Sequence, residues 1–378
     1  MNGKQVITTG CNIVSPLGFT AEENFRAVRS GESGVSTHMG TFGIPEPFGA
    51  SLFDRKAVFD RAAAEGISGR CFFETVLLLS ARDAIRRAGI DPASPRVAFV
   101  VSSIKGNVEA MDADEAAVPV SVTAGRVAAF FGNPNPPLVV SNACISGLTA
   151  LIHARRMLLD GRYDYVVVAG AEVQSRFIVS GFLSLKAVSP VLCKPFDADR
   201  CGLNLGEAAA TMVVSAVDAC PDEAWCLVDG ATRNDANHIS GPSRTGEGSY
   251  KALRYVLSAC DPSELAFVNV HGTSTLYNDE MESIALHRAG LSAVPVNALK
   301  GVFGHTMGAA GILESIISMS AADAGIVLAT RGFEQPGVSC PVNVCGENRP
   351  ATGRAFIKLL SGFGGCNAAL LFRKGGAR

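Results

Sequence analysis

The sequence predicts an α/β protein in which layers of strands and helices form two similar halves. Apolar residues make up 48% of the 378 residues and charged residues 18%, which is typical of a large domain with an extensive core. Short β-branched runs alternate with stretches of helical periodicity, a pattern that favours packed βα units. The order helix, Asp-Pro turn and strand AFV occurs in AGIDPASPRVAFVVSS and again about 170 residues later in SACDPSELAFVNV. The two halves are expected to be 1–218 and 219–378.

The individual elements follow from local patterns. A turn at SPLG precedes a predicted helix at 21–30, and a longer apolar periodicity predicts a helix at 72–88. The run YVVVAG is continuously apolar, which is typical of a strand buried on both faces of a sheet. Strands are predicted at 5–9, 97–102, 165–170, 211–217, 355–359 and 368–372.

The segment 138–160, LVVSNACISGLTALIHARRMLLD, joins a short β-branched run to an amphipathic helix. Cys144 lies at this junction, so it is expected at a helix N-terminus, with Gly161 ending the helix. The positive end of the helix favours an anion, which lowers the pKa of a thiol and raises its reactivity. The alternative is a buried structural cysteine, the commoner role of this residue type.

Composition excludes several classes of function. A net charge of −2 argues against general nucleic-acid binding. No stretch reaches about 18 uninterrupted apolar residues, and the N-terminus lacks a charged region followed by an apolar run, so neither a membrane span nor export is predicted. The 11 cysteines contain no CxxC pair and are odd in number, so a disulfide framework or a structural zinc site is not expected. A reducing cytoplasm is the expected location.

Two histidines occur in unusual settings in the second half. His271 follows the strand AFVNV and opens the polar loop HGTST, and His305 lies in GVFGHTMGAAG before a helix. Because sites in α/β sheets gather beyond the carboxyl ends of strands, both are expected to converge with Cys144. Lys300 and Glu282 are expected either to support this site as an ion pair or to form a surface salt bridge of little consequence.

Four segments together identify a family. NACISG, NVHGTST, NALKGVFGHTMGAAG and SGFGGCN, in this order, resemble the β-ketoacyl-acyl-carrier-protein synthases, the elongating condensing enzymes of the thiolase superfamily. The resemblance runs from ITTGCNIVSPLG to GGCNAALLF. It implies a thiolase-like fold with a layered α-β-α-β-α core.

The resemblance also implies a site and partners. It implies a catalytic set of Cys144, His271 and His305 supported by Lys300 and Glu282, with Phe363 as gate and, through its N–H, part of an oxyanion hole. Thr273 and Thr275 are implied to bind the phosphopantetheine arm of an acyl carrier protein. A homodimer or a ketosynthase-like heterodimer is expected, without metal or cofactor.

The family's chemistry is a decarboxylative Claisen condensation of an acyl thioester with malonyl-acyl-carrier protein, in fatty-acid, polyene or polyketide biosynthesis. A thiolate accepts the acyl chain, and the enolate formed on loss of CO₂ needs hydrogen-bond donors at its oxygen. The three residue types at these positions meet both requirements.

The sequence departs from the family in several places. Ser361 replaces the first Phe of the motif NSFGFGG, and PFDADRCGLNLGEA differs from the usual pattern at Cys201, Leu203, Asn204 and Ala208. The segment 102–138 is shorter than in family members, and Lys105 replaces a small residue. We expect a re-shaped acyl tunnel with Lys105 near its rim.

Three alternative functions remain open at this point. A chain-length-factor-like partner subunit generally lacks the nucleophile, which Cys144 retains. A thiolase acting on coenzyme A thioesters uses a second cysteine as base, and Cys366 is a candidate. A chain-initiating synthase pairs Cys and His with Asn, where this chain has His305.

Overall fold

The structure is a computed structural model that describes residues 3–376. Eleven strands form its main sheet, in the order β13-β11-β10-β15-β16-β9-β1-β8-β6-β4-β5. They are β1 (Gln5–Val14), β4 (Val97–Ser102), β5 (Leu138–Val140), β6 (Tyr165–Glu172), β8 (Ala208–Val217), β9 (Trp225–Asn234), β10 (Leu265–Asn269), β11 (Pro295–Asn297), β13 (Asn343–Val344), β15 (Ala355–Gly362) and β16 (Cys366–Lys374). Two small sheets contain β2 (Ser36–His38), β3 (Phe48–Ser51) and β7 (Leu205–Gly206), and β12 (Ile326–Val327) and β14 (Arg349–Pro350).

The α-helices begin and end close to the predicted positions where a prediction was made. They are α1 (Ala21–Arg29), α2 (Arg55–Ala64), α3 (Phe72–Ala88), α4 (Val120–Phe130), α5 (Ser146–Leu159), α6 (Arg176–Ser184), α7 (Glu247–Val256), α8 (Leu276–Arg288), α9 (Lys300–Phe303) and α10 (Ala310–Asp323). Short 3-10 turns are η1 (Thr41–Gly43), η2 (Val108–Ala110), η3 (Glu115–Ala117), η4 (Leu257–Ala259), η5 (Pro262–Glu264) and η6 (Met307–Ala309). Among residues 3–376, none of these helices combines the length and apolar character that a membrane crossing requires.

The two halves of the sheet have the same topology. In the first half β4 is parallel to β5 and β6, whereas β8 is antiparallel to β6 and β1. In the second half β10 is parallel to β11 and β15, whereas β16 is antiparallel to β15 and β9. A single bridge, Ile7 to Cys226, joins the halves. The expected pair of similar halves is therefore confirmed, and we propose that the boundary at 218/219 lies in the β8–β9 connection.

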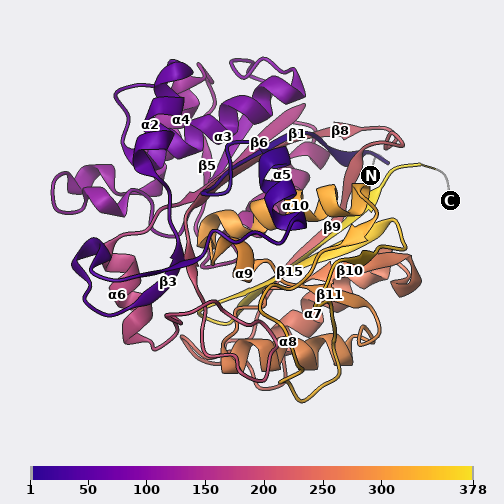
Figure 1. The fold of residues 1–378 in the computed structure, drawn as a ribbon. Helices are drawn as coiled ribbons and strands as arrows, with labels where there is room; N and C mark the ends of the chain where they lie inside the picture. The colour runs from indigo at the N-terminus through magenta and orange to yellow at the C-terminus, as the bar shows by residue number, and fades with distance from the viewer. Residues whose placement is uncertain (1–2, 377–378) are drawn as a thin grey trace.

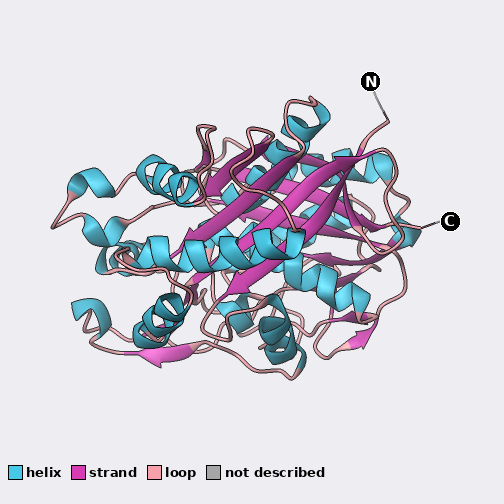
Figure 2. Cartoon of the chain, turned by 90° about the horizontal axis from the view of Figure 1, so that it is seen from above, coloured by secondary structure: helices cyan, strands magenta, loops and turns pink. Residues whose placement is uncertain are grey.

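The elements form five layers, α-β-α-β-α, as expected. Helices α5 and α10 pack against each other between the two halves of the sheet, in the largest apolar cluster (Figure 1). Helices α2, α3 and α4 cover the outer face of the first half, and α7 and α8 cover that of the second half. The view from above shows the twisted strands with helices on both sides of them (Figure 2). The fold thus brings the N-termini of α5 and α10 together at its centre.

Glycines permit this close approach. A Cβ at Gly147 of α5 would lie 2.8 Å from the Gly308 carbonyl oxygen, and a Cβ at Gly311 of α10 would overlap the backbone of Leu148. Because backbones meet here without intervening side chains, the loops that precede α5 and α10 lie beside each other. Those loops carry Cys144 and His305.

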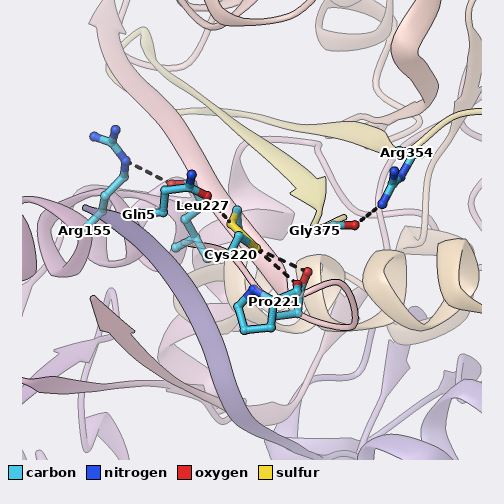
Figure 3. Close-up of a disulfide and its surroundings, with 9 residues drawn as sticks. Gln5, Arg155, Cys220, Pro221, Leu227, Arg354 and Gly375 are labelled. Atoms are coloured by element: carbon cyan, nitrogen blue, oxygen red, sulfur yellow. Dashed lines mark hydrogen bonds between the residues drawn. A yellow bond between two sulfur atoms is a disulfide. The ribbon is translucent and has the colours of Figure 1, made fainter. Parts of the chain in front are cut away.

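A disulfide joins Cys220 and Cys226 in the connection between the halves (Figure 3). The sequence predicted no disulfide framework, and this is the one disulfide within residues 3–376; the other nine cysteines are free thiols. Cys226 also contacts the Gln5 side chain, Sγ to Oε1 at 3.4 Å, and Arg155 donates to the Leu227 carbonyl at 3.0 Å. These contacts fasten the start of β9 to β1 and α5.

Candidate active site

Cys144 lies in a tight turn between β5 and α5. Ala143 has φ 44°, a left-handed conformation that non-glycine residues seldom adopt. The Ser146 hydroxyl stabilises the turn, since it donates to the Ala143 carbonyl at 2.6 Å and accepts from the Asn142 N–H at 2.8 Å. Helix α5 begins at Ser146, two residues after Cys144, so the predicted placement at a helix N-terminus is confirmed.

The predicted lowering of the Cys144 pKa is wrong for this structure. Burial raises the pKa of the thiol to about 12, and Cys366 adds to the increase. Lys300 and a hydrogen bond from the Phe363 backbone N–H act in the opposite direction and are outweighed. The physical reason is desolvation, because Cys144 is only 6% exposed and a thiolate there has little contact with water.

The structure brings Cys144, His271 and His305 together. The two imidazole rings meet edge to face, with centroids 5.0 Å apart and an interplanar angle of 80°. One nitrogen of each ring and the Cys144 sulfur lie within 4.8 Å of one another. His271 follows β10 and His305 precedes α10, so three loops from both halves of the sheet meet at one point, as the sequence predicted.

Both histidines are neutral. Burial, followed by the charge of Lys300, holds their pKa values well below the ordinary value, and Lys358 contributes in the same direction. The Met307 N–H donates to His305 Nδ1 at 3.3 Å, so Nδ1 is the acceptor and the proton resides on Nε2. His305 Nε2 and His271 Nδ1 are buried without a hydrogen-bond partner. At His305 the unpartnered atom is therefore an N–H donor available to a ligand.

The predicted ion pair between Lys300 and Glu282 is wrong. Lys300 Nζ instead pairs with Glu314 Oε1, and Lys358 Nζ lies 2.5 Å from Glu314 Oε2. All three side chains are at most 2% exposed. The reason is topological: Glu314 lies on α10, which packs in the central layer behind Lys300, whereas Glu282 lies on α8 in an outer layer.

Glu282 has a different role at the site. Its carboxylate accepts hydrogen bonds from the backbone N–H groups of His271 at 2.8 Å and Gly272 at 2.7 Å, and from Asn278 at 2.9 Å. Burial and the neighbouring Asp279 raise its pKa. Glu282 thus fixes the backbone that carries His271, rather than balancing the charge of Lys300.

A cavity of about 610 Å³ opens onto the three residues. Thr273 and Thr275 line it, with their hydroxyl oxygens 2.9 Å apart. The Phe363 ring also lines it and stacks on Phe182, with centroids 5.8 Å apart. The residues implied to bind a pantetheine arm and to gate the site therefore lie along one channel to Cys144.

The Gly-rich turn after β15 touches the Cys144 loop. A Cβ at Gly362 would lie 3.0 Å from the Cys144 nitrogen and 2.8 Å from the Cys366 sulfur, so this close approach depends on glycine. It places the Phe363 N–H against the Cys144 sulfur. Two backbone N–H groups, of Cys144 and Phe363, are therefore candidates for an oxyanion hole.

The departures from the family have identifiable positions. Asn204 accepts from the His305 N–H through its backbone carbonyl at 2.7 Å, and its side chain caps the Cys193 N–H at 2.7 Å. Cys201 is an exposed thiol in the cavity wall, and Ser361 bonds Asn367 at 2.8 Å. Asn204 thus helps to hold His305.

The shortened segment 102–138 does not line the open cavity. Lys105 lies 5.5 Å from the ring centroid of Phe177 on α6, and no residue of 102–138 lines the cavity described above. Lys105 does not line this cavity, and its expected placement near the rim of an acyl tunnel stays a prediction. Val108 packs with Ile178 and Met307, next to Ile104, in a small apolar cluster behind the catalytic residues.

The donor set also has the composition of a metal site. One thiol and two imidazoles, all buried and mutually close, are ligands that zinc prefers. The sequence-based expectation that the protein uses no metal stays a prediction.

Sequence reasoning missed Glu314, Lys358 and Glu172. Glu172 at the end of β6 accepts hydrogen bonds from the N–H groups of Ile104, Lys105 and Gly308 and from the Ser103 hydroxyl. The available signal was a lone charge inside an apolar run, as in GILESII, AFIKLL and VVVAGAE. Such charges are rarely buried unless they are paired.

Comparison with protein families decides the classification. Residues 4–219 match the model of the N-terminal domain of beta-ketoacyl synthase, and residues 225–334 match that of its C-terminal domain. The chain belongs to the beta-ketoacyl synthase family. It is therefore a ketosynthase, which performs Claisen condensation in fatty-acid or polyketide biosynthesis.

Individual relatives cover the whole chain. It is 28% identical to 3-oxoacyl-[acyl-carrier-protein] synthase 2 of Vibrio cholerae, covering 99% of this chain and 100% of the relative. It is also 28% identical to the tetracenomycin polyketide synthase ketoacyl synthase alpha subunit of Streptomyces glaucescens, covering 98% and 97%. A ketosynthase solved in complex with its chain length factor, from Xenorhabdus doucetiae, superposes with a TM-score of 0.86 at 21% identity, covering 98% of each chain. The thiolase-like fold expected from the sequence is confirmed.

Proposed function

We propose that the protein is an elongating ketosynthase of the 3-oxoacyl-acyl-carrier-protein synthase type, with Cys144 as nucleophile. The observation that carries the proposal is the meeting of the Cys144 thiol with two neutral imidazoles, within 4.8 Å, in a cavity that opens to solvent. A nucleophile and hydrogen-bond donors at one point are what acyl transfer followed by enolate formation requires.

The first half-reaction loads the acyl group. The pantetheine arm of an acyl carrier protein lies along Thr273 and Thr275 and delivers its thioester past Phe363. The Cys144 sulfur attacks the thioester carbonyl, and the N–H groups of Cys144 and Phe363 hold the oxyanion. The C–S bond to pantetheine breaks, the pantetheine thiol leaves with the proton of Cys144, and an acyl-Cys144 thioester remains.

The second half-reaction forms the carbon–carbon bond. The malonyl thioester oxygen accepts hydrogen bonds from His271 and His305 while the bond to its carboxylate breaks and CO₂ leaves. The resulting enolate carbon attacks the acyl carbonyl, and the Cys144 sulfur leaves as a thiolate that takes up a proton from solvent through the open cavity. Because both imidazoles are neutral, they stabilise the enolate as donors without first releasing a proton.

The alternatives fit the site less well. A chain-length-factor-like subunit does not need the complete Cys144, His271 and His305 set. A thiolase reaction would use Cys366 as base, whereas the groups that lie within 4.8 Å of the Cys144 sulfur are the imidazoles of His271 and His305. A chain-initiating synthase would have an amide at the position of His305.

The partners follow from the same proposal. An acyl carrier protein supplies both thioesters. A two-fold dimer, with itself or with a ketosynthase-like subunit, is supported by the edge position of the short strand β5, where Leu138 is 39% exposed. The complex of the Xenorhabdus doucetiae relative with its chain length factor makes the heterodimer a specific candidate. A cytoplasmic location stays a prediction.

Intact-mass measurement tests the proposed function. The protein is incubated with a panel of acyl-carrier-protein thioesters, and peptide mapping then locates the adduct. We expect one acyl group on Cys144, and CO₂ release and a chain longer by two carbons after malonyl-carrier protein is added. The Cys340→Ser variant, which removes a free thiol outside the cavity, should behave like the wild type. An adduct on Cys366, or no adduct with any thioester, would contradict the proposal.

A further inference from the structure

A fully buried lysine lies behind the histidine pair, and the reaction described above gives it no task. Lys358 lies on β15, directly opposite Asn269 of β10 in the parallel register. Its side chain is 0% exposed, and its ammonium contacts Glu314 Oε2 at 2.5 Å. Glu314 already has a second cation in Lys300. One carboxylate is thus shared by two lysines, so Glu314 does not by itself require Lys358 for charge balance.

The remaining contacts of Lys358 point to the backbone at His271. Its Nζ donates to the Val270 carbonyl at 3.1 Å and lies 3.5 Å from the Asn269 carbonyl. Together with Glu314 these are three acceptors, which match the three N–H donors of a protonated lysine. A neutral amine would direct a lone pair at one of these oxygens. The geometry therefore fits an ammonium group, although burial lowers the pKa of Lys358 to about 8 while Glu314 acts in the opposite direction. Below that pH, two positive charges with one negative charge leave the cluster at +1.

The peptide group between Val270 and His271 is held at both of its polar ends. Lys358 binds its carbonyl oxygen at 3.1 Å, and Glu282 accepts from its N–H at 2.8 Å. The Lys358 ammonium on β15 and the Glu282 carboxylate on α8 thus bind opposite ends of one peptide group, an arrangement called the clamp below. The His271 side chain extends from the next atom of the chain, so the clamp sets the direction of the ring toward Cys144.

We propose that Lys358 is a positioning residue for the decarboxylation half-reaction. Its ammonium, held by Glu314, orients the Val270–His271 peptide and places a positive charge near both imidazoles. The inference rests on the proposed function for its kinetic consequence, but its structural consequence can be measured on the resting protein. Lys358 touches neither the nucleophile nor the cavity lining, so it acts through His271.

The charged groups around the histidines define the expected pH effect. His271 is faced by Lys300, His305 and Lys358, with Glu282 on its backbone, and His305 is faced by Lys300 and Lys358. Both lysines disfavour a protonated imidazole. Removing Lys358 therefore raises the pH at which each ring takes up a proton. Protonation at His305 sets an Nδ1–H against the Met307 N–H and disrupts that contact.

The Lys358→Met variant tests the proposal, because methionine fills similar volume without charge or donor and leaves the Lys300–Glu314 pair intact. We expect loading of Cys144, followed by intact mass, to remain within about twofold of the wild type. CO₂ release from malonyl-carrier protein should fall by about 10- to 100-fold, as expected when a catalytic group is misplaced. The acid limb of its pH profile should shift to higher pH. The matched control is Lys374→Met on the adjacent strand β16. It removes a 2.7 Å ion pair with Asp323 at the end of α10 and should change neither step.

Nitrogen NMR of the imidazoles provides a readout without substrate. In Lys358→Met the signals of His271 and His305 should titrate at higher pH than in the wild type, while the signal of His153 on α5 stays unchanged. If Lys358→Met does not fold, Lys358→Gln, which keeps a donor without the charge, is measured in the same way.

Unchanged His271 and His305 titrations, or equal loss of loading and CO₂ release, would overturn the proposal. Wild-type protein that neither loads nor releases CO₂ would instead contradict the proposed function, and the NMR comparison would still decide the role of Lys358.

Discussion

The two halves of the molecule share a strand order but differ in the buried charge that their equivalent strands β6 and β15 place beside the backbone. In the first half, Glu172 at the end of β6 accepts from backbone N–H groups of the loop that follows β4. In the second half, Lys358 of β15, the strand equivalent to β6, donates to backbone carbonyls at the end of β10, the strand equivalent to β4. The shared topology places equivalent strands at equivalent positions in the two halves. The carboxylate of Glu172 binds backbone N–H groups, whereas the ammonium of Lys358 binds backbone carbonyl oxygens.

The difference shows how one architecture provides two kinds of chemistry. The first half presents Cys144, the proposed nucleophile, on a strained turn before a helix, where burial raises the pKa of the thiol. The second half presents two imidazoles whose pKa values are held low by burial first and by the charges of Lys300 and Lys358 second. Variants in each half should therefore fail at different steps.

The largest effect is expected for Cys144→Ser in the first half. A serine hydroxyl is a much weaker nucleophile than a cysteine thiol, so condensation should fall by more than about 10³-fold. Chain elongation followed by mass spectrometry is the measurement, with Cys340→Ser as control. Retained elongation would show that the nucleophile lies elsewhere.

The next effect is expected for His305→Ala in the second half. The loss of one donor to the enolate oxygen should slow CO₂ release by about 10²–10³-fold. Self-acylation of Cys144 should continue, because the proposed oxyanion hole consists of the N–H groups of Cys144 and Phe363. CO₂ release from malonyl-carrier protein and intact mass of the acylated protein separate the two steps. Unchanged CO₂ release would remove His305 from this role.

A smaller effect is expected where the two halves touch, at Gly362→Ala. The added Cβ meets the Cys144 nitrogen at 3.0 Å and the Cys366 sulfur at 2.8 Å, so the turn and the Cys144 loop must separate. Loading should slow by about 10- to 100-fold, since a shift of about 1 Å has effects of this size. Gly125→Ala, with open space around the added atom, is the control. Equal loading rates for both variants would argue against the Phe363 N–H as an oxyanion donor.

The smallest effect is expected for Glu172→Gln, which tests the charge in the first half. An amide offers one acceptor oxygen and sets its NH₂ group against backbone donors that Glu172 now satisfies. The free energy of unfolding should fall by about 1–3 kcal/mol, measured by denaturant titration. Glu223→Gln, at a side chain that is 97% exposed, should stay within about 0.5 kcal/mol of the wild type. Equal stability of the two variants would show that the Glu172 charge does not hold the loop.

The local pattern of the sequence predicted most of the fold. The helix 72–88 and the strand 97–102 have the predicted bounds, because apolar periodicity and flanking turns specify both. The repeated Asp-Pro turn indicated two similar halves, and the shared strand order confirms them. Strand lengths were less well predicted: β1 extends to Val14 rather than residue 9, because pairing with β8 continues past the point where its own alternation weakens.

The sequence by itself also determined the residue types of the site, since motifs name Cys144, His271 and His305 directly. Only the tertiary structure decided their state and their support. Desolvation of Cys144 depends on the layers packed around it, so a helix N-terminus alone predicted the wrong direction for its pKa. The partner of Lys300 is Glu314, on a helix that crosses behind it, and Lys358 joins them from a strand 44 positions beyond Glu314. Which charged side chains pair across layers depends on how the two halves of the sheet pack together. The spacing of these residues along the chain therefore does not predict the pairs.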